Sequence, residues 1–558
     1  MENNTLSPWK RLIGLLKLER KDIFQIGYYA IFEGIVALSL PLGIQTIINL
    51  LQGAQITASW IVLIVLVTIG VAFSGVLKLM QMRIIETIQQ RIFTRASLEL
   101  SYRLPKIKMN ELRNYYLPEL ANRFFDTLTI QKGLSKILID VPSAFLQIIF
   151  ALILLSFYHP FFIVFGFLLM ILIYIVFKYT AEKGLETSLN ESKNKYKVAH
   201  WLQEISRCVI SFKLSGSTDL AMQKSDSLVN DYLISRENHF KILILQYKQM
   251  ISFKVLITAG LLFTGGFLVL NQQMNIGQFV AAEIIVLLVI NSVEKLILGL
   301  ESFYDVLTSI EKLGQVVDKP IESQKGELIK NNTHLNIELK DVSYQVSNRN
   351  NPILKNISFT VHPKDRIFIE GESGAGKSSL LQLITGVIMP TAGHIYINNL
   401  SIESLFINKY RANLGLSLSE ENPFEGTIRE NVTFGNKEIN DEVIYEAFNH
   451  IGLTDFLKQQ PNGLNTFLKP EGKQIAYTIS KKLVLARAIV KKPKVLILED
   501  PLDQFDKQEA MKIIRFLTNP AQPWSLIVVS NNEIWKKNCN KLIILNKGII
   551  TANIEHNL

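Results

Sequence analysis

Cysteine is almost absent from this chain of 558 residues, whose two cysteines, Cys208 and Cys539, lie far apart in the sequence. A secreted domain held together by disulfides needs several cysteines, and a cysteine-based zinc site also needs a cluster of them. The sequence therefore excludes both classes of protein. So few cysteines agree with a reducing environment such as the cytoplasm.

Charged residues are scarce as well. They make up 19% of the chain, whereas hydrophobic residues make up 48%. This average is too apolar for an ordinary soluble protein and too charged for a chain that lies wholly in a membrane, so we expect one part in lipid and another in water. Lysine and arginine on the cytoplasmic side of a membrane explain the net charge of +10. We therefore expect a lipid bilayer, and no nucleic acid, as a partner.

Six segments are apolar and long enough to cross a bilayer, which takes about 20 helical residues. They comprise residues 24–50, 58–80, 138–157, 160–179, 250–271 and 276–298. The alternative is that they are buried core helices of a large soluble protein. The segments that connect them decide between the two interpretations.

Basic residues alternate between these connecting segments. Residues 51–59, 158–160 and 271–278 contain no lysine or arginine, whereas the N-terminus and residues 81–137 and 180–249 are rich in both. This is the positive-inside pattern of membrane proteins, and it predicts that both termini are cytoplasmic. The two long basic connections are amphipathic, which predicts helices that continue the spans into the cytoplasm. We expect no cleaved signal peptide, because no short apolar core with a small-residue cleavage site begins the chain.

Two carboxylates lie inside the predicted spans, Glu33 in the first and Glu283 in the sixth. A carboxylate in lipid is costly, so either residue could face a substrate path. The alternative is that it bonds to a neighbouring helix or lies near the interface. The sequence leaves both interpretations open.

The second half of the chain has a different pattern, in which short apolar strands alternate with helical segments. This alternation is typical of an α/β domain. We therefore predict a multi-domain protein with an all-α six-helix membrane domain at residues 1–320, a linker at residues 319–334 and an α/β domain at residues 335–558.

The strongest motif of the α/β domain is G-x-x-x-x-G-K-S, which lies between a predicted strand and a predicted helix. Glycines let such a loop wrap so closely that its N–H groups point at phosphate oxygens, and the helix adds its positive N-terminal end. Lys377 would bridge the β- and γ-phosphates of ATP, and the Ser378 hydroxyl would bind Mg²⁺. The residues predicted to hold the nucleotide are Gly371, Glu372, Ser373, Gly374, Ala375, Gly376, Lys377, Ser378 and Ser379.

An acidic pair, Glu499 and Asp500, ends a predicted buried strand at residues 495–498. A carboxylate at this position can hold the water shell of a metal ion. Such a pair is a weak signal alone and a strong one beside a phosphate loop. We therefore predict ATP and Mg²⁺ as cofactors, with Ser378 and Glu499 on the metal.

The six spans, the phosphate loop and three further motifs resemble the half-transporters of ATP-binding cassette (ABC) exporters. These motifs are GTIRENVTFG at residues 426–435, LVLARAIVKKPKVLILED at residues 483–500 and NKG at residues 546–548. The resemblance covers essentially the whole chain. It implies a type I exporter fold with a P-loop NTPase domain, and a dimer whose nucleotide-binding domains enclose two ATP molecules. Residues 118–125 and 205–216 fall where that family has its coupling helices.

Several positions that the family uses in catalysis carry other residues in this sequence. Ser419 stands where the family has a glutamine that senses Mg²⁺ and water. The signature LSGGQ corresponds to IAYTI, in which Ala476 replaces the serine and Tyr477 and Thr478 replace the two glycines. A tyrosine side chain would crowd a place meant for glycine in the partner's ATP site.

The other changes lie in the chain's own ATP site. The family has aspartate then glutamate where this chain has Glu499 and then Asp500, so the candidate base is shorter by a methylene. Ser530 replaces the histidine that holds the γ-phosphate, and Val346 replaces the aromatic residue that stacks on adenine. Asp506 agrees with the family pattern.

Two hypotheses follow from the resemblance. In the first, the chain is an active exporter that forms a homodimer, and Glu499 and Asp500 share metal and base duties. In the second, the chain binds ATP without hydrolysing it and is the partner of a catalytically complete half-transporter, because loss of a base or of a phosphate ligand costs several orders of magnitude in rate.

The transported substrate cannot be read from the sequence directly. The membrane-domain segment RFFDTLTIQKGLSKILID at residues 123–140 is similar to exporters of proteins and peptides in type I secretion. That similarity implies a bacterial inner membrane, a periplasmic adaptor and an outer-membrane channel. Lipids and small amphiphiles stay open as alternative cargo.

Overall fold

The computed structural model describes residues 7–52, 58–113, 115–329, 334–346, 349 and 351–555. Parts of the first connecting segment, of the predicted linker and of the predicted α/β domain lie outside the described residues, namely 53–57, 330–333, 347, 348, 350 and 556–558. The chain divides into two compact units, which we describe separately. Unit 1 comprises Met1–Lys106 and Asn114–Lys319, and unit 2 comprises Ile107–Arg113 and Pro320–Leu558.

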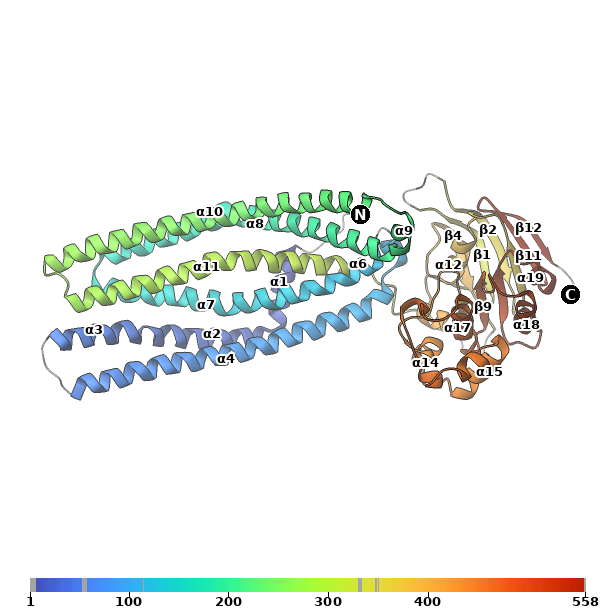
Figure 1. The fold of residues 1–558 in the computed structure, drawn as a ribbon, viewed down its shortest axis with the longest axis horizontal. Helices are drawn as coiled ribbons and strands as arrows, with labels where there is room; N and C mark the ends of the chain where they lie inside the picture. The colour runs from blue at the N-terminus through green and yellow to red at the C-terminus, as the bar shows by residue number, and fades with distance from the viewer. Residues whose placement is uncertain are drawn as a thin grey trace. The chain divides into compact units, whose positions relative to one another are not determined.

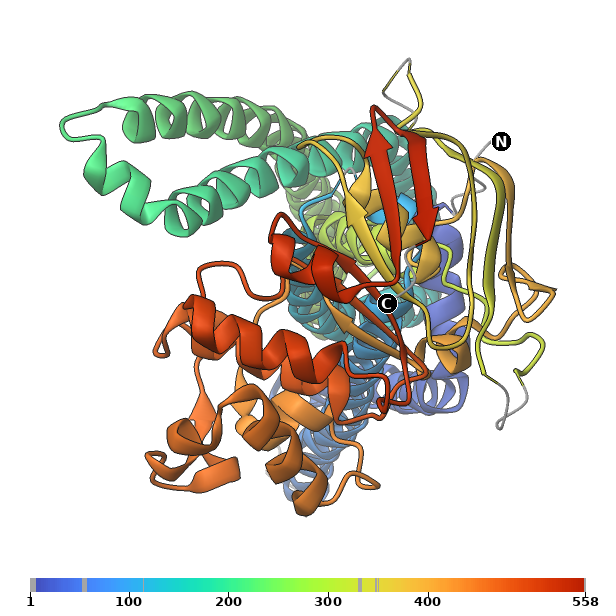
Figure 2. The ribbon, with the colours of Figure 1, turned by 90° about the vertical axis from the view of Figure 1, so that its right-hand side faces the viewer.

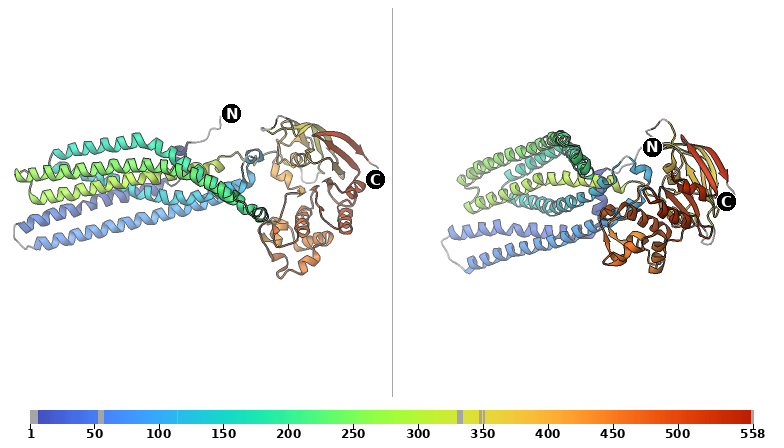
Figure 3. Two further views of the ribbon diagram at one scale, coloured as in Figure 1. Left: turned by 45° about the horizontal axis from the view of Figure 1, so that its top comes forward. Right: turned by 45° about the vertical axis from the view of Figure 1, so that its right-hand side comes forward.

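Unit 1 is built from long helices that run side by side (Figures 1 and 3). Among the described residues, six helical segments are long and apolar enough to cross a membrane, which confirms the predicted number. Some apolar side chains are strongly exposed, such as Phe157 at 82% and Phe263 at 80%, as expected for a surface that faces lipid. The elements are α1 (Pro8–Leu18), α2 (Arg20–Ala37), α3 (Ser39–Gln52), α4 (Ala58–Arg103), η1 (Leu104–Lys106), α6 (Leu117–Asn122), η2 (Arg123–Phe125), α7 (Asp126–Tyr158), α8 (Phe161–Arg207), α9 (Val209–Leu214), α10 (Leu220–Leu270) and α11 (Ile276–Val317).

The first span differs from the single continuous segment predicted at residues 24–50. It consists of α2 and α3, which are separated at Leu38. Pro41 explains the break, because proline has no N–H with which to continue the helical hydrogen bonds back to residue 37. The two long basic connections are helical as predicted, since α4, α7, α8 and α10 all continue well beyond their apolar segments.

Glu33 lies in the interior of unit 1 and bonds to two neighbouring helices. Its carboxylate accepts hydrogen bonds from Ser143 of α7 at 3.2 Å and from Gln81 of α4 at 3.4 Å. Glu33 is 7% exposed. Its contacts therefore agree with the interhelical interpretation, in which hydrogen bonds offset the cost of burying a polar group. Glu283 is half-buried on α11.

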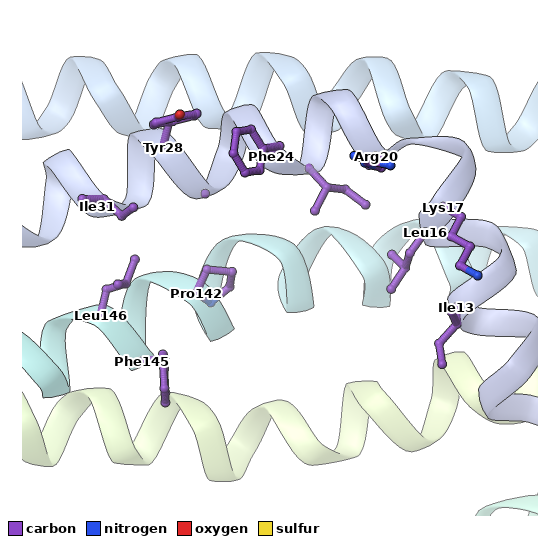
Figure 4. A pocket seen from close by; sticks show the side chains of 12 residues that line it. Ile13, Leu16, Lys17, Arg20, Phe24, Tyr28, Ile31, Pro142, Phe145 and Leu146 are labelled. Carbon is purple, nitrogen blue, oxygen red and sulfur yellow. The ribbon is translucent and has the colours of Figure 1, made fainter.

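An apolar hollow of about 600 Å³ lies between α1, α2 and α7 (Figure 4). Ile31 of α2 and Leu146 of α7 lie on either side of it, beside Pro142, and Lys17 and Arg20 lie at one end. An apolar wall with basic residues at one end is typical of a surface at the level where lipid chains meet headgroups.

Unit 2 contains two larger sheets, whose strands Figure 2 shows in yellow to red. A four-stranded antiparallel sheet has the order β2-β1-β4-β5, and a six-stranded sheet has the order β12-β11-β3-β10-β9-β6. In the second sheet, β11, β3, β10, β9 and β6 are parallel and only the edge strand β12 is antiparallel. The strands are β1 (Ile337–Tyr344), β2 (Leu354–Val361), β3 (Arg366–Glu370), β4 (Ala392–Ile397), β5 (Leu400–Ser401), β6 (Leu414–Ser417), β7 (Gly426–Thr427), β8 (Phe467–Leu468), β9 (Val495–Glu499), β10 (Ser525–Val529), β11 (Lys541–Asn546) and β12 (Ile549–Glu555).

The six-stranded sheet is buried on both faces, which is why its central strands are continuous apolar runs. Successive residues of β9 enter opposite cores. Ile497 packs with α12 and the antiparallel sheet, whereas Leu496 and Leu498 pack with the helices α14 to α18. The helices are α5 (Met109–Leu112), α12 (Lys377–Ile384), α13 (Ile407–Arg411), α14 (Ile428–Thr433), α15 (Asp441–Ile451), α16 (Thr454–Lys458), α17 (Tyr477–Ile489), α18 (Lys507–Leu517) and α19 (Glu533–Asn538). The short 3-10 turns are η3 (Gly463–Asn465) and η4 (Pro470–Gly472).

Candidate functional site

The predicted site residues follow four neighbouring parallel strands of the six-stranded sheet. Gly371 follows β3, Glu499 ends β9, Ser530 follows β10 and Ser419 lies just after β6. The carboxyl ends of parallel strands lie at the same edge of a sheet, where α/β proteins bind their ligands. The sheet therefore brings together residues that are far apart in the sequence.

The glycines of the phosphate loop are required by its geometry. Gly374 and Gly376 have left-handed backbone conformations, with φ of 82° and 99°. A Cβ atom on Gly371 would lie 2.3 Å from the carbonyl oxygen of Leu545, and one on Gly376 would lie 2.8 Å from a methyl carbon of Leu354. A side chain at either position would clash, so the loop keeps a close backbone surface that fits a phosphate.

The side chains of Lys377 and Ser378 point to different parts of the site. The Lys377 ammonium donates to the carbonyl oxygens of Gly371 at 2.6 Å and Glu372 at 3.0 Å. The Ser378 hydroxyl donates to the carboxylate of Glu499. The Ser378 hydroxyl at the start of α12 and the Glu499 carboxylate at the end of β9 fit Mg²⁺. This ion usually takes one or two protein ligands and completes its shell with water and substrate phosphates.

Ser419 contacts the second oxygen of the Glu499 carboxylate. Its hydroxyl donates to Oε2 of Glu499 at 3.1 Å, and its N–H lies 3.4 Å from the same atom. The ammonium of Lys481 in α17 in turn donates to the carbonyl oxygen of Ser419 at 2.5 Å and to that of Glu421 at 3.1 Å. Sequence analysis missed Lys481, because nothing in its sequence neighbourhood indicates a contact with a residue more than sixty positions away.

Asp500 occupies a strained backbone position beside Ser530. Its φ is 41°, which is uncommon for a residue other than glycine, and its N–H donates to the carbonyl oxygen of Val529 at 2.9 Å. Burial raises the pKa of Asp500, and the nearby Glu499 and Asp503 raise it further. Lys377 and a hydrogen bond with Ser530 oppose this rise. Such a carboxyl suits a group that exchanges a proton.

The pH dependence of stability tests this environment. Between the ordinary pKa of aspartate, about 4, and the raised folded-state pKa of Asp500, the unfolded chain loses the proton while the folded chain keeps it. Folding is therefore less favourable as pH rises through this window. We expect Asp500→Asn to raise the apparent melting temperature of the full-length chain above pH 4 relative to wild type, and to leave it nearly unchanged below. If the difference in melting temperature between Asp500→Asn and wild type is the same from acid to neutral pH, this environment of Asp500 is contradicted.

The remaining predicted nucleotide residues lie in or near the loop. Ala375 is buried, Glu372 and Ser373 are exposed, and Ser379 is half-buried in α12. Ser530 is 8% exposed, and its hydroxyl accepts a hydrogen bond from the N–H of Asn532 at 3.2 Å.

Three further positions singled out in the sequence lie on other elements. Val346 is half-buried against the core that contains α12. Asp506 caps α18 through a hydrogen bond from the N–H of Gln508 at 2.9 Å. Tyr477 begins α17 and is 44% exposed, and Ala476 before it offers no side-chain cap.

The two sequence motifs GTIREN and LARA meet in the interior of unit 2. In α14, Thr427 and Glu430 form a capping box. Arg487 of α17 donates through Nε to the carbonyl oxygen of Asn431 at 2.7 Å and through Nη2 to its side-chain oxygen at 3.2 Å. This contact fixes α14 against α17, and it explains why both motifs are informative in the sequence.

Comparison with known proteins agrees with this architecture. The ABC transporter family model matches residues 354–503. The structure of a bacterial Atm1-family ABC exporter with ATP bound has a TM-score of 0.85, covers 96% of this chain and 95% of its own chain, and is 16% identical in sequence. The chain thus contains an ABC transporter domain and has the fold of an ABC exporter.

Curated relatives of this chain include two bacterial ATP-binding proteins. The alpha-hemolysin translocation ATP-binding protein HlyB of Escherichia coli O157:H7 is 28% identical over 295 residues, which is 53% of this chain and 42% of HlyB. The ABC transporter ATP-binding protein YknU of Bacillus subtilis is 28% identical over 299 residues, which is 53% of this chain and 51% of YknU. The chain thus spans about half the length of these relatives.

Proposed function

We propose that this chain uses ATP to drive export of a substrate across a membrane. The observation that carries the proposal is the contact of Ser378 with Glu499 below the phosphate loop, in a chain that also contains six helical segments long enough to cross a membrane. ATP and Mg²⁺ are the proposed cofactors. The similarity to HlyB, which is named for translocation of alpha-hemolysin, supports a protein or peptide as cargo.

The proposed roles follow from the positions of the side chains. The loop from Gly371 to Ser378 and the N-terminus of α12 hold the phosphates, and Lys377 leaves its two carbonyl partners to bind them. Ser378 and Glu499 hold Mg²⁺, which neutralises negative charge on the phosphates. Asp500 accepts a proton from the attacking water, and Ser419 and Ser530 lie where they could orient it.

The proposed assembly is a dimer of half-transporters in a bacterial inner membrane, with both termini in the cytoplasm. In such a dimer the start of α17, including Tyr477, would face the partner's nucleotide. A periplasmic adaptor and an outer-membrane channel are further proposed partners, on the basis of the resemblance to type I secretion. The positive-inside pattern of the connecting segments supports the cytoplasmic position of both termini.

The purified full-length chain in lipid vesicles would test the proposal. We expect saturable ATP binding and Mg²⁺-dependent ATP turnover, together with ATP-dependent uptake of a labelled peptide by vesicles whose nucleotide-binding domains face outward. A chain that binds no ATP would contradict the proposal. ATP turnover without peptide uptake would support the proposed ATPase activity and exclude peptides as cargo.

A second candidate function is that of a subunit that binds ATP without hydrolysing it, beside a catalytically complete partner chain. The contacts of Glu499 favour it, because both of its carboxylate oxygens have serine partners, Ser378 and Ser419, where the family has one serine or threonine and a glutamine. ATP binding without turnover by the isolated chain, and turnover after addition of a second half-transporter, would favour this candidate. Turnover by the isolated chain would exclude it.

A further inference from the structure

A polar cavity lies within unit 1, and the residues that line it are distant in sequence from those of the nucleotide site. Its volume is about 540 Å³, and it lies between the turn of α6 and η2 and the helices α8, α10 and α11. Its wall includes Arg123, Lys193, Lys197, Lys224 and Lys312. A cavity of this size can hold a small ligand, and five basic side chains around it favour an anion.

Arg123 forms the most deeply buried part of the wall. It is 7% exposed, and its Nη2 atom donates to Glu119 at 2.9 Å. Its buried Nε and Nη1 atoms have no hydrogen-bond partner among the described residues. The guanidinium lies 3.7 Å from the centre of the Tyr196 ring, which fixes its plane. Buried donors without a partner are costly, so a charged guanidinium with two such donors in the wall of a polar cavity favours a compensating anion there.

Lys312 of α11 lies beside Arg123 and is also 7% exposed. Within the part of the chain that the structure describes, its ammonium has no carboxylate within ion-pair distance. The nearby Asp126 accepts a hydrogen bond from the Tyr196 hydroxyl at 2.5 Å. Arg123 is paired with Glu119, and Asp126 lies near both cations. The three further lysines of the wall bring the cations to more than these carboxylates, which favours an anion in the cavity.

The acidic residues in the wall are already paired. Glu119 contacts Arg123 and lies 3.4 Å from the imidazole of His200, and Glu204 forms hydrogen bonds with Arg207 at 2.6 and 3.0 Å. Lys193 and Lys197 are exposed at the mouth of the cavity. Lys224 lies there too, 4.1 Å from the centre of the Trp201 ring. The cavity thus keeps an excess of positive charge from its mouth to its floor.

The position of the cavity along the helices favours a soluble source of the anion over membrane lipids. Arg123, Lys193 and Lys312 lie about 14 to 15 residues beyond the nearest ends of the apolar segments 138–157, 160–179 and 276–298. At 1.5 Å per helical residue, this places them about 21 Å from the lipid chains. A headgroup region adds only about 5 to 7 Å on each side of the hydrocarbon, so most of this distance lies beyond the phospholipid phosphates.

We propose that this cavity binds a small soluble anion with several phosphate groups, held at its floor by Arg123 and Lys312 and at its mouth by Lys193, Lys197 and Lys224. Several phosphates match several separated cations, and the positive charge of the Arg123 guanidinium at the cavity wall attracts one of them. The site is separate from the nucleotide site of unit 2 and does not depend on the proposed transport function.

Inorganic tripolyphosphate is a suitable probe, titrated into the full-length chain by calorimetry. The Lys377→Ala variant serves as the background, so that the phosphate loop does not contribute. We expect saturable binding to one site, and at least about tenfold weaker binding for Arg123→Gln and for Lys312→Met. Lys183→Gln is the matched control, because Lys183 is an exposed lysine of α8 outside the cavity, and it should bind as the background does.

Lys197→Gln keeps the test valid if a buried variant fails to fold, because Lys197 is exposed. We expect it to weaken binding about threefold and to make the salt dependence of binding shallower. Equal affinities for Lys197→Gln and Lys183→Gln would overturn the proposal, as would no binding by the background.

Loss of tripolyphosphate binding in nanodiscs of anionic lipid, relative to zwitterionic lipid, would show that lipid headgroups occupy the cavity and would overturn the soluble source. ATP turnover plays no part in this readout, so failure of the transport function would not affect it.

Discussion

Replacement of Lys377 by alanine is expected to weaken ATP binding by about a hundredfold and to abolish ATP-driven transport. The ammonium lies within the phosphate loop, where it donates to the carbonyl oxygens of Gly371 and Glu372. A hydrogen bond to a charged group contributes about 1.5 to 3 kcal/mol, and a loss of about 2.7 kcal/mol is a hundredfold change in affinity. Calorimetric titration of MgATP into the full-length chain measures the change.

Lys409→Ala provides the control for this experiment. Lys409 is an exposed lysine on α13 of the same unit, and it belongs neither to the phosphate loop nor to the acidic pair. Its substitution removes the same charge and should leave ATP affinity unchanged. An unchanged melting temperature of Lys377→Ala would show that the loss comes from the missing ammonium. If Lys377→Ala binds ATP as tightly as Lys409→Ala, the phosphate loop is not the nucleotide site.

Much of the nucleotide site could be predicted from the sequence because its residues come from short motifs with local geometry. The left-handed backbone at Gly374 and Gly376 is a property of the loop itself, and the glycine spacing of the motif encodes it. The close approach of Gly371 to Leu545 depends on tertiary packing. The meeting of Ser378 with Glu499 could also be expected, since both follow buried parallel strands. The number of membrane helices followed from apolar length and from the alternation of basic residues, neither of which depends on tertiary structure.

Contacts between distant side chains could not be predicted in the same way. The bond of Lys481 to the carbonyl oxygen of Ser419 depends on how α17 packs beside β6, and no local pattern encodes that packing. The same holds for Arg123, whose free donors become evident only when three other helices enclose it. The break at Leu38 was missed for a different reason. Pro41 was visible, but proline is tolerated in membrane helices often enough that the apolar segment alone indicated one continuous span.

Replacement of Arg487 by methionine is expected to destabilise unit 2 by about 3 kcal/mol, because it leaves the buried main-chain carbonyl oxygen of Asn431 without its donor and removes one of the two donors to its side-chain oxygen. Asn431 is 0% exposed and Arg487 is 6% exposed, so water cannot replace the lost hydrogen bonds. The guanidinium carbon also lies 4.8 Å from the centre of the Phe434 ring. Methionine keeps most of the apolar stem. For a domain of this size, we expect the apparent melting temperature of the full-length chain to fall by about 6 to 12 °C.

A double-mutant cycle decides which partner of Arg487 matters. Its other partner, Glu421, lies 3.5 Å away with a side chain that is 30% exposed, and burial raises the pKa of Glu421, so this carboxylate can reach water or take up a proton when the arginine is lost. Glu421→Gln should therefore cost about 1 kcal/mol or less, and the double variant should melt close to Arg487→Met alone. Arg515→Met, at an exposed position of α18, should leave the melting temperature within about 2 °C of wild type. If Glu421→Gln destabilises the chain as much as Arg487→Met, the ion pair rather than Asn431 fixes α14 against α17.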